Sequence, residues 1–239
     1  MKLLYCEASD DANFMKSRVF EGIEYPLRPY FAMEGIVGAG KSTQMKLLLP
    51  FLVAEFPRHE IIFTHEPGHS EIADVIRNTV QVREFTEAMT WLCEASLYTS
   101  SRAQTLPTIV GPALEQGKIV GGDRSAITSC SYQGYGRELG IERILAINRP
   151  VVGNLWPSKV IVIDTPMNLA LARAQDKLGD KFERLGEDFF HKARQGYYEM
   201  ANRNKWVFDV IDGAGTEEEV QKRVRLSVVN FLRREVGLE

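Results

Sequence analysis

The chain has 239 residues, of which 44% are hydrophobic and 26% are charged, and its net charge is −3. These values suit one α/β domain with an ordinary core, and they give no indication of a nucleic-acid partner or of an anionic membrane surface. No apolar run approaches the ~20 residues needed to span a bilayer, no secretion signal opens the chain, and the cysteines lie far apart without a C-x-x-C pair, so we expect a cytoplasmic protein without structural disulfides or zinc.

Residues 1–29 precede the first clear strand and show no periodic pattern. They could form a flexible arm, a strand added to a sheet edge, or a contact with a partner, and the sequence leaves these alternatives open. We therefore divide the chain into an N-terminal extension of unknown role, residues 1–29, and one domain, residues 30–239.

A phosphate-binding loop follows the first strand. The apolar segment Tyr30–Glu34 is typical of a buried strand, the next eight residues fit G-x-x-x-x-G-K-[ST], and a Leu-rich helix follows. In such a loop the backbone N–H groups and the helix N-terminus face phosphate oxygens, the amine of Lys41 reaches the β- and γ-phosphates, and the hydroxyl of Ser42 takes Mg²⁺. The residues expected to bind ATP are Gly35, Gly38, Ala39, Gly40, Lys41, Ser42 and Thr43.

The next segments are a helix and a second strand. Proline removes a helical hydrogen bond, so we expect the helix to bend or stop near Leu49, before Pro50. Glu60–Thr64 is typical of a buried strand. Ligands bind at the carboxyl ends of parallel strands, so Glu66 is a candidate site residue there. The alternative is a solvated charge followed by an ordinary turn at Pro67.

Helices are expected over Glu71–Val80 and Phe85–Thr105. The second helix carries Tyr98 and Arg102 four residues apart, and therefore on one face. An aromatic ring and a guanidinium on one face could stack on a nucleobase and hydrogen-bond to it. The alternative is a core tyrosine and a surface arginine.

The third expected strand, residues 119–122, ends at Asp123 and Arg124. A carboxylate at this position of a P-loop fold lies near Mg²⁺, and an adjacent arginine can clamp a phosphate. A local Asp–Arg ion pair is the alternative.

Two more strands, Lys159–Asp164 and Trp206–Ile211, alternate with helices that begin at Met167, Glu187 and Glu217. The order predicts an α/β fold of the P-loop NTPase type, a parallel five-stranded sheet with helices on both faces. Between these elements, residues 177–186 combine two glycines with basic side chains. They could form a lid that closes over phosphates, or a solvated charged loop.

Several of these segments resemble motifs of the thymidylate kinase family of nucleoside monophosphate kinases. They are residues 34–44 (EGIVGAGKSTQ), 64–70 (THEPGHS), 101–104 (SRAQ), 123–134 (DRSAITSCSYQG) and 180–201. The resemblance implies transfer of the γ-phosphoryl group of Mg-ATP to dTMP or a related nucleotide, giving dTDP and ADP, by a homodimer.

The resemblance also implies roles for individual residues. Tyr98 would lie on the thymine face, Arg102 at its edge, and Tyr132 under the sugar. The acceptor site would comprise Glu66, Pro67, Tyr98, Arg102, Arg124, Ser129, Tyr132 and Gln133. The catalytic residues would be Lys41, Asp123, Arg124, Arg173, Lys181 and Arg184, with Ser42 and Asp123 at Mg²⁺.

The chain departs from the family pattern at several positions. Val37 stands where the family commonly has a carboxylate that touches the sugar 3′-hydroxyl. Valine cannot accept that hydrogen bond, and a buried unpaired hydroxyl costs roughly 1–3 kcal/mol. The other departures are His65 and Lys181 in place of arginines, Ser101 in place of aspartate, and Ser125 in place of an aromatic residue.

Two other functions fit parts of the sequence. A deoxynucleoside kinase would phosphorylate a 5′-hydroxyl, with Glu66 as the base. A nucleotide-binding regulatory protein would bind ATP with weak turnover, although the intact Lys41, Ser42 and Asp123 favour an enzyme.

Overall fold

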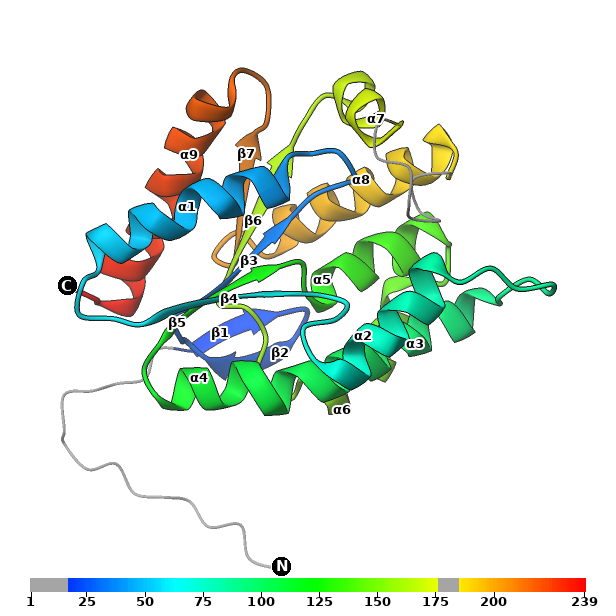
Figure 1. Ribbon diagram of the computed structural model, residues 1–239, viewed down its shortest axis with the longest axis horizontal. Coiled ribbons are helices and arrows are strands. Elements are labelled where there is room, and N and C mark those ends of the chain that lie inside the picture. Colours follow the sequence, from blue (N-terminus) through cyan, green and yellow to red (C-terminus); the bar gives the residue numbers. More distant parts are fainter. Residues whose placement is uncertain (1–16, 176–184) are drawn as a thin grey trace, which may run out of the picture.

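The computed structural model describes residues 17–175 and 185–239, and its centre is a parallel sheet of five strands. The strand order is β4-β5-β3-β6-β7 (Figure 1). The strands are β3 (Tyr30–Glu34), β4 (Ile61–His65), β5 (Ile119–Asp123), β6 (Lys159–Asp164) and β7 (Phe208–Asp212). All four pairings are parallel, which confirms the expected sheet. The last strand begins two residues later than expected, because Trp206 is 81% exposed and lies outside the sheet.

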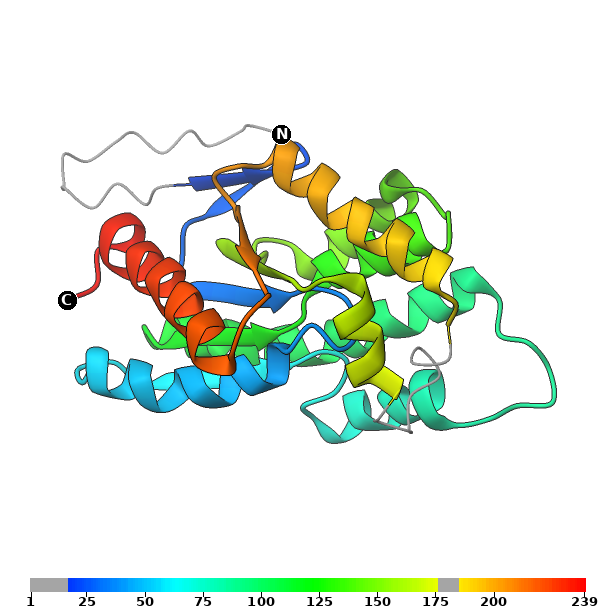
Figure 2. The same ribbon diagram turned by 90° about the horizontal axis from the view of Figure 1, so that it is seen from above.

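Helices cover both faces of the sheet (Figures 1 and 2). Helices α1 (Lys41–Glu55) and α9 (Glu217–Asn230) lie together on one face, and α3 (Trp91–Thr105), α6 (Ile141–Val152) and α8 (Glu187–Arg203) lie on the other side. The shorter helices are α2 (Glu71–Arg77), α4 (Gly111–Glu115), α5 (Ala126–Ser129) and α7 (Met167–Gln175). Wider helical turns extend several of them: η1 (Asn78–Val82), η2 (Leu106–Val110), η3 (Cys130–Gly136) and η5 (Phe231–Val236). None of the helices in the described ranges combines the length and apolar character needed to cross a bilayer.

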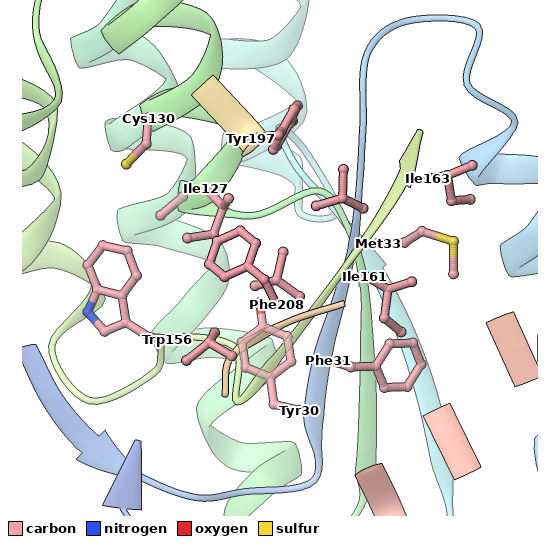
Figure 3. Close-up of a cluster of buried hydrophobic side chains, with 14 of the residues drawn as sticks. Tyr30, Phe31, Met33, Ile127, Cys130, Trp156, Ile161, Ile163, Tyr197 and Phe208 are labelled. Atoms are coloured by element: carbon pink, nitrogen blue, oxygen red, sulfur yellow. The ribbon is translucent and has the colours of Figure 1, made fainter. Parts of the chain in front are cut away.

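The core has two layers because successive strand residues point to opposite faces of the sheet. Phe31 and Met33 of β3 lie on the α1 side, beside Ile161 and Ile163 of β6 (Figure 3). Tyr30 points to the other side, which Figure 3 shows packed with large side chains from several elements. All these residues are 2% exposed or less, so the sheet is a rigid platform for the loops at its carboxyl edge.

Three helix predictions need correction. Helix α1 continues through Pro50 to Glu55, because the proline is exposed while Leu48 and Leu52 on either side are fully buried and hold the helix to the core. Helix α3 begins at Trp91 rather than Phe85, where the Thr90 hydroxyl caps the helix. The helix expected over Glu71–Val80 ends as α2 at Arg77 and passes into η1. Helix α6 was not predicted.

Residues 17–26 form an antiparallel hairpin of β1 (Ser17–Phe20) and β2 (Ile23–Pro26), a sheet of its own rather than an added strand of the main sheet. Its two turn residues, Glu21 and Gly22, both have positive φ (47° and 75°), as tight hairpin turns require. Phe20 is fully buried against Trp156, with ring centroids 5.3 Å apart, so the hairpin is part of the packed domain.

Candidate functional site

A cleft of about 730 Å³ opens at the carboxyl ends of the strands. It is lined by the P-loop, the ends of β4 and β5, and by α3, η3, α7 and the turn before α9. The sequence-predicted site residues along it are Gly38, Ala39, Gly40, Lys41, Ser42, Thr43, Glu66, Pro67, Tyr98, Arg102, Asp123, Arg124, Ser129, Tyr132, Gln133 and Arg173. Gly35, at the start of the loop, does not line this cleft, and Lys181, Arg184 and most of the expected lid fall outside the described residues. The structure thus brings nearly all described candidates to one cleft.

The P-loop follows a path that two of its glycines make possible. A side chain at Gly38 would place its Cβ 1.9 Å from the Ala170 carbonyl oxygen of α7, and φ there is 73°. At Gly35, φ is 135° and a Cβ would lie 2.6 Å from the Ile163 carbonyl oxygen. The loop therefore packs against β6 and α7 by bare backbone, and it leads directly into the N-terminus of α1, which favours an anion.

Lys41 lies inside the loop, at the first turn of α1. Its Nζ donates to the carbonyl oxygens of Gly35 at 3.1 Å and of Ile36 at 2.8 Å. The side chain is 6% exposed, so its charge is held at the loop rather than in solvent. A fixed cation at the N-terminus of a helix is suited to the phosphates of a nucleotide.

A pair of oxygen ligands lies next to the lysine. The Ser42 hydroxyl donates to Oδ2 of Asp123 at 2.9 Å, across from α1 to the end of β5. Within the described residues, no three His, Cys, Asp or Glu side chains form a cluster that could enclose a metal ion. One hydroxyl and one carboxylate fit Mg²⁺, which keeps several waters and binds through few protein oxygens together with phosphates. The partner of the Asp123 carboxylate is thus the Ser42 hydroxyl, and the structure does not contain the alternative, a local ion pair between Asp123 and Arg124.

Arg124 lies between two halves of the cleft. The donor half is the P-loop with its neighbours Asp123 and Arg173, and the acceptor half is formed by α3, α5, η3 and the residues after β4. It has a left-handed backbone, with φ 76°. One guanidinium nitrogen donates to the Gly35 carbonyl oxygen at 3.3 Å, and the other donates to the Tyr132 hydroxyl at 3.4 Å. The group lies 5.1 Å from the centre of the Tyr132 ring. This arginine is in place to contact phosphates on both sides.

Glu34, at the end of β3, is a fully buried carboxylate under this arginine, and its importance was not predicted. Its oxygens accept hydrogen bonds from the hydroxyls of Ser125 at 2.7 Å, Thr128 at 2.5 Å and Tyr197 at 2.9 Å. Burial raises the pKa of Glu34, and these hydroxyls and Arg124 oppose that rise. The carboxylate thus ties β3 to α5 and α8 directly behind the phosphate site.

The acceptor half contains a buried polar network centred on Arg102. Its Nε donates to Oε2 of Glu66 at 2.7 Å, and one terminal nitrogen donates to Oδ1 of Asn148 at 2.5 Å. The other terminal nitrogen lies 3.4 Å from the Ser129 hydroxyl. Arg102 is 2% exposed, so the alternative of a surface arginine is wrong. Its charge faces the cleft from a position in the core.

Glu66 is held by this network rather than left to act on a substrate hydroxyl. It is 7% exposed and follows β4 with a cis peptide bond to Pro67. Burial raises the pKa of the Glu66 carboxyl, and the guanidinium of Arg102 opposes that rise. The ion pair makes Glu66 an anchor of the buried network, because losing either partner would leave the other charge buried without compensation.

Two histidines lie beside Glu66. Nδ1 of His65, which lines the cleft, is 3.2 Å from Nδ1 of His69. Burial, followed by His69 and Arg77, lowers the pKa of His65. At neutral pH the His65 side chain therefore carries less positive charge than the arginine that the family resemblance implies for this position. Val37 also lines the cleft, where it offers no hydrogen-bonding side chain.

Other polar residues of the acceptor half were missed. Gln81 is 8% exposed and donates to the Tyr98 hydroxyl at 3.3 Å. Glu94 is 5% exposed and pairs with Arg137. A signal for Glu94 existed, because it precedes Tyr98 by four residues and so shares its helical face. Gln81 lies in a wide helical turn, which periodicity does not reveal.

Comparisons with known proteins agree with this geometry. A family model described as thymidylate kinase matches residues 33–224. The thymidylate kinase of Fervidobacterium nodosum is 37% identical over 195 residues, which cover 82% of this chain and 95% of that protein. The thymidylate kinase of Syntrophotalea carbinolica is 35% identical over 216 residues, covering 87% and 99%. A crystal structure of thymidylate kinase from Ehrlichia chaffeensis superposes with a TM-score of 0.68 at 25% identity, covering 83% of this chain and 97% of that one.

Proposed function

Because the chain belongs to the thymidylate kinase family, and is thus an ATP-dependent nucleoside monophosphate kinase, we propose that it phosphorylates dTMP, giving dTDP and ADP. The observation that carries the proposal is the position of Arg124. Its guanidinium touches the P-loop at Gly35 and the acceptor side at Tyr132, in a cleft that both halves share.

The acceptor needs little activation. A phosphate monoester has a second pKa near ~6 and is mostly dianionic at neutral pH, so an oxygen of dTMP can attack without a general base. The barrier is then set by position and by charge. Lys41 and the loop N–H groups bind the donor phosphates, and Arg124 holds the acceptor phosphate in line with them. Arg173, at the cleft side of α7, adds positive charge.

Ser42 and Asp123 would hold Mg²⁺, which when bound neutralises phosphate charge and orients the donor. The shared hydrogen bond between these two residues places both oxygens at the same end of the loop. Residues 177–186 would act as a lid that excludes water and adds the charges of Lys181 and Arg184.

The deoxynucleoside kinase alternative is less consistent with the site. It needs Glu66 as a base, whereas Glu66 is buried in an ion pair with Arg102. The family match, which covers residues 33–224, favours the monophosphate kinase.

The base and sugar would be bound by the acceptor half. The base stacks on Tyr98, with Arg102 at its edge and Ser129 and Gln133 beside it, and the ring of Tyr132 lies under the sugar. Pro67 and Glu66 close the pocket. Because Val37 provides no acceptor for the 3′-hydroxyl, we propose that the enzyme tolerates 3′-altered nucleotides.

The test is ADP release by the purified protein with Mg-ATP and dTMP, dUMP, dGMP, 3′-deoxy-dTMP or thymidine. Turnover on dTMP well above thymidine is expected, with 3′-deoxy-dTMP used about equally well. Turnover on thymidine alone would make the protein a nucleoside kinase. ATP binding without ADP production with any acceptor would favour the regulatory alternative.

The proposal includes two properties of the whole protein. We propose a cytoplasmic enzyme of nucleotide biosynthesis, since its substrates are free nucleotides. We also propose a homodimer, which size-exclusion chromatography with light scattering would test by a mass near twice the 27.0 kDa of one chain.

A further inference from the structure

Gln133 reaches the acceptor half of the cleft with its amide held in one orientation. The side chain is 1% exposed, lines the cleft, and donates from Nε2 to Oε1 of Glu94 at 3.0 Å. A carboxylate only accepts hydrogen bonds, so the NH₂ end of the amide must face Glu94. The carbonyl oxygen accepts no hydrogen bond from the residues that the structure describes, so it is the end of the amide that remains for a ligand.

Glu94 is itself held in place. Arg137 donates to both of its carboxylate oxygens, from Nε at 3.2 Å and from a terminal nitrogen at 2.9 Å. The guanidinium of Arg137 lies 3.9 Å from the centre of the Trp91 ring and 5.0 Å from that of Phe189. A forked ion pair stacked on aromatic rings has little freedom to turn. The orientation of the Gln133 amide is therefore set by residues behind the cleft.

A second group of fixed polarity lies nearby. Arg102 can only donate hydrogen bonds, and Glu66 and Asn148 hold its guanidinium. Its remaining terminal nitrogen is near the hydroxyl of Ser129, which precedes Gln133 by four residues in the α5–η3 segment. The base end of the cleft thus presents a hydrogen-bond donor, the Arg102 guanidinium, and an acceptor, the Gln133 carbonyl oxygen. The donor cannot become an acceptor, nor the acceptor a donor.

Pyrimidine bases differ in the pattern that complements such a pair. Thymine and uracil offer an acceptor at O4 and a donor at N3–H, whereas cytosine offers a donor at N4 and an acceptor at N3. We propose that Glu94 is a positioning residue that fixes the Gln133 carbonyl toward the base, and so makes the acceptor site select a 2,4-dioxopyrimidine over a 4-aminopyrimidine. This inference rests on the proposed function, because it takes the base of a nucleoside monophosphate to lie at Arg102 and Gln133.

The experiment measures the dissociation constants of dTMP and 5-methyl-dCMP, which differ only at N3 and C4, by calorimetry. The proteins are the full-length wild type, Glu94→Gln, Arg137→Lys, and the matched control Glu115→Gln on the exposed end of α4. A glutamine at position 94 can donate hydrogen bonds as well as accept them, so the Gln133 amide can flip and exchange its oxygen and nitrogen ends. We expect the preference for dTMP to fall about 10-fold in Glu94→Gln, because one of the two mismatches with the cytosine edge is removed, and to stay unchanged in Glu115→Gln.

If Glu94 had a purely structural role, Glu94→Gln would weaken the binding of both nucleotides by the same factor. An unchanged preference for dTMP in Glu94→Gln would therefore overturn the inference. Should Glu94→Gln not fold, Arg137→Lys releases the same carboxylate and must also lower the preference. In a Gln133→Met background, Glu94→Gln must have no further effect on the preference for dTMP over 5-methyl-dCMP. Because binding is measured, wild-type protein that binds dTMP selectively but releases no ADP would refute the proposed function and leave this test intact.

Discussion

The donor half of the cleft is built mainly from one continuous segment, residues 37–44, with Asp123 and Arg173 beside it, whereas the acceptor half is assembled from side chains of α3, α5 and η3 and of the residues that follow β4. In the donor half, the proposed function assigns phosphate binding to backbone groups and Lys41, and glycines allow the path of the loop. In the acceptor half, buried polar side chains such as Arg102 are held by partners far away in the chain; Asn148 is 46 residues from Arg102. A local motif can therefore lose one side chain and keep its shape, but a distributed network cannot.

The largest effect is expected from Arg102→Met, in the acceptor half. The change leaves Glu66 buried without its ionic partner, and breaking a buried pair in this way costs about 3–5 kcal/mol. Urea unfolding measures the loss, and Glu66→Gln combined with Arg102→Met should recover part of it. A loss below about 1 kcal/mol would mean that the acceptor network does not depend on this pair.

Lys41→Met, in the donor half, should act on activity instead. Removing one charge-stabilising group typically lowers kcat about 100- to 1,000-fold. The fold should tolerate the change, because the loop path is set by Gly35 and Gly38 rather than by the lysine. Steady-state kinetics with dTMP would detect it, with Lys46→Met on the exposed side of α1 as the control. The contrast between the halves fails if Lys41→Met destabilises the protein as much as Arg102→Met does.

Val37→Asp tests the boundary between the halves. A carboxylate there can accept a hydrogen bond from the sugar 3′-hydroxyl, a charged interaction worth about 1.5–3 kcal/mol. The ratio of kcat/KM for dTMP to that for 3′-deoxy-dTMP should rise by about 10- to 140-fold, from a value near one in the wild type. Equal ratios in the two proteins would place the 3′-hydroxyl elsewhere.

The smallest effect concerns Glu34, behind the phosphate site. Its pKa is raised by burial, so the folded protein holds this proton more tightly than the unfolded chain does. The free energy of unfolding should then decrease as the pH rises from the usual glutamate pKa toward the raised value. Glu34→Gln has no such proton, and its unfolding free energy should change less, as the pH rises above the usual glutamate pKa, than that of the wild type or of Glu115→Gln. Parallel curves for all three proteins would contradict this account.

The two halves also differ in how much their sequence reveals. The five strands and the P-loop follow from short local patterns: apolar runs, glycine spacing, and a Lys-Ser pair before a helix. The burial of Arg102 does not, because it depends on Asn148 in α6, a helix that no pattern predicted. Of the bend or stop expected near Leu49, the stop was wrong for a similar reason, since the packing of Leu48 and Leu52 outweighs the local preference of proline. Val37 and His65 stand out as candidate determinants of substrate selectivity only when the sequence is compared with the family pattern.

The N-terminal hairpin has a consequence for how the chain is made. Tyr25 donates to the Pro157 carbonyl oxygen at a separation of 132 residues, and the backbone N–H of Arg28 donates to the Ser158 hydroxyl at a separation of 130. The hairpin leaves the ribosome before the main sheet does, yet its docking surface is synthesised only after β3, β4 and β5. At about 5–20 residues per second, the buried Phe20 waits many seconds for Trp156. During translation this apolar side chain is exposed, and it becomes buried only after Trp156 has been synthesised.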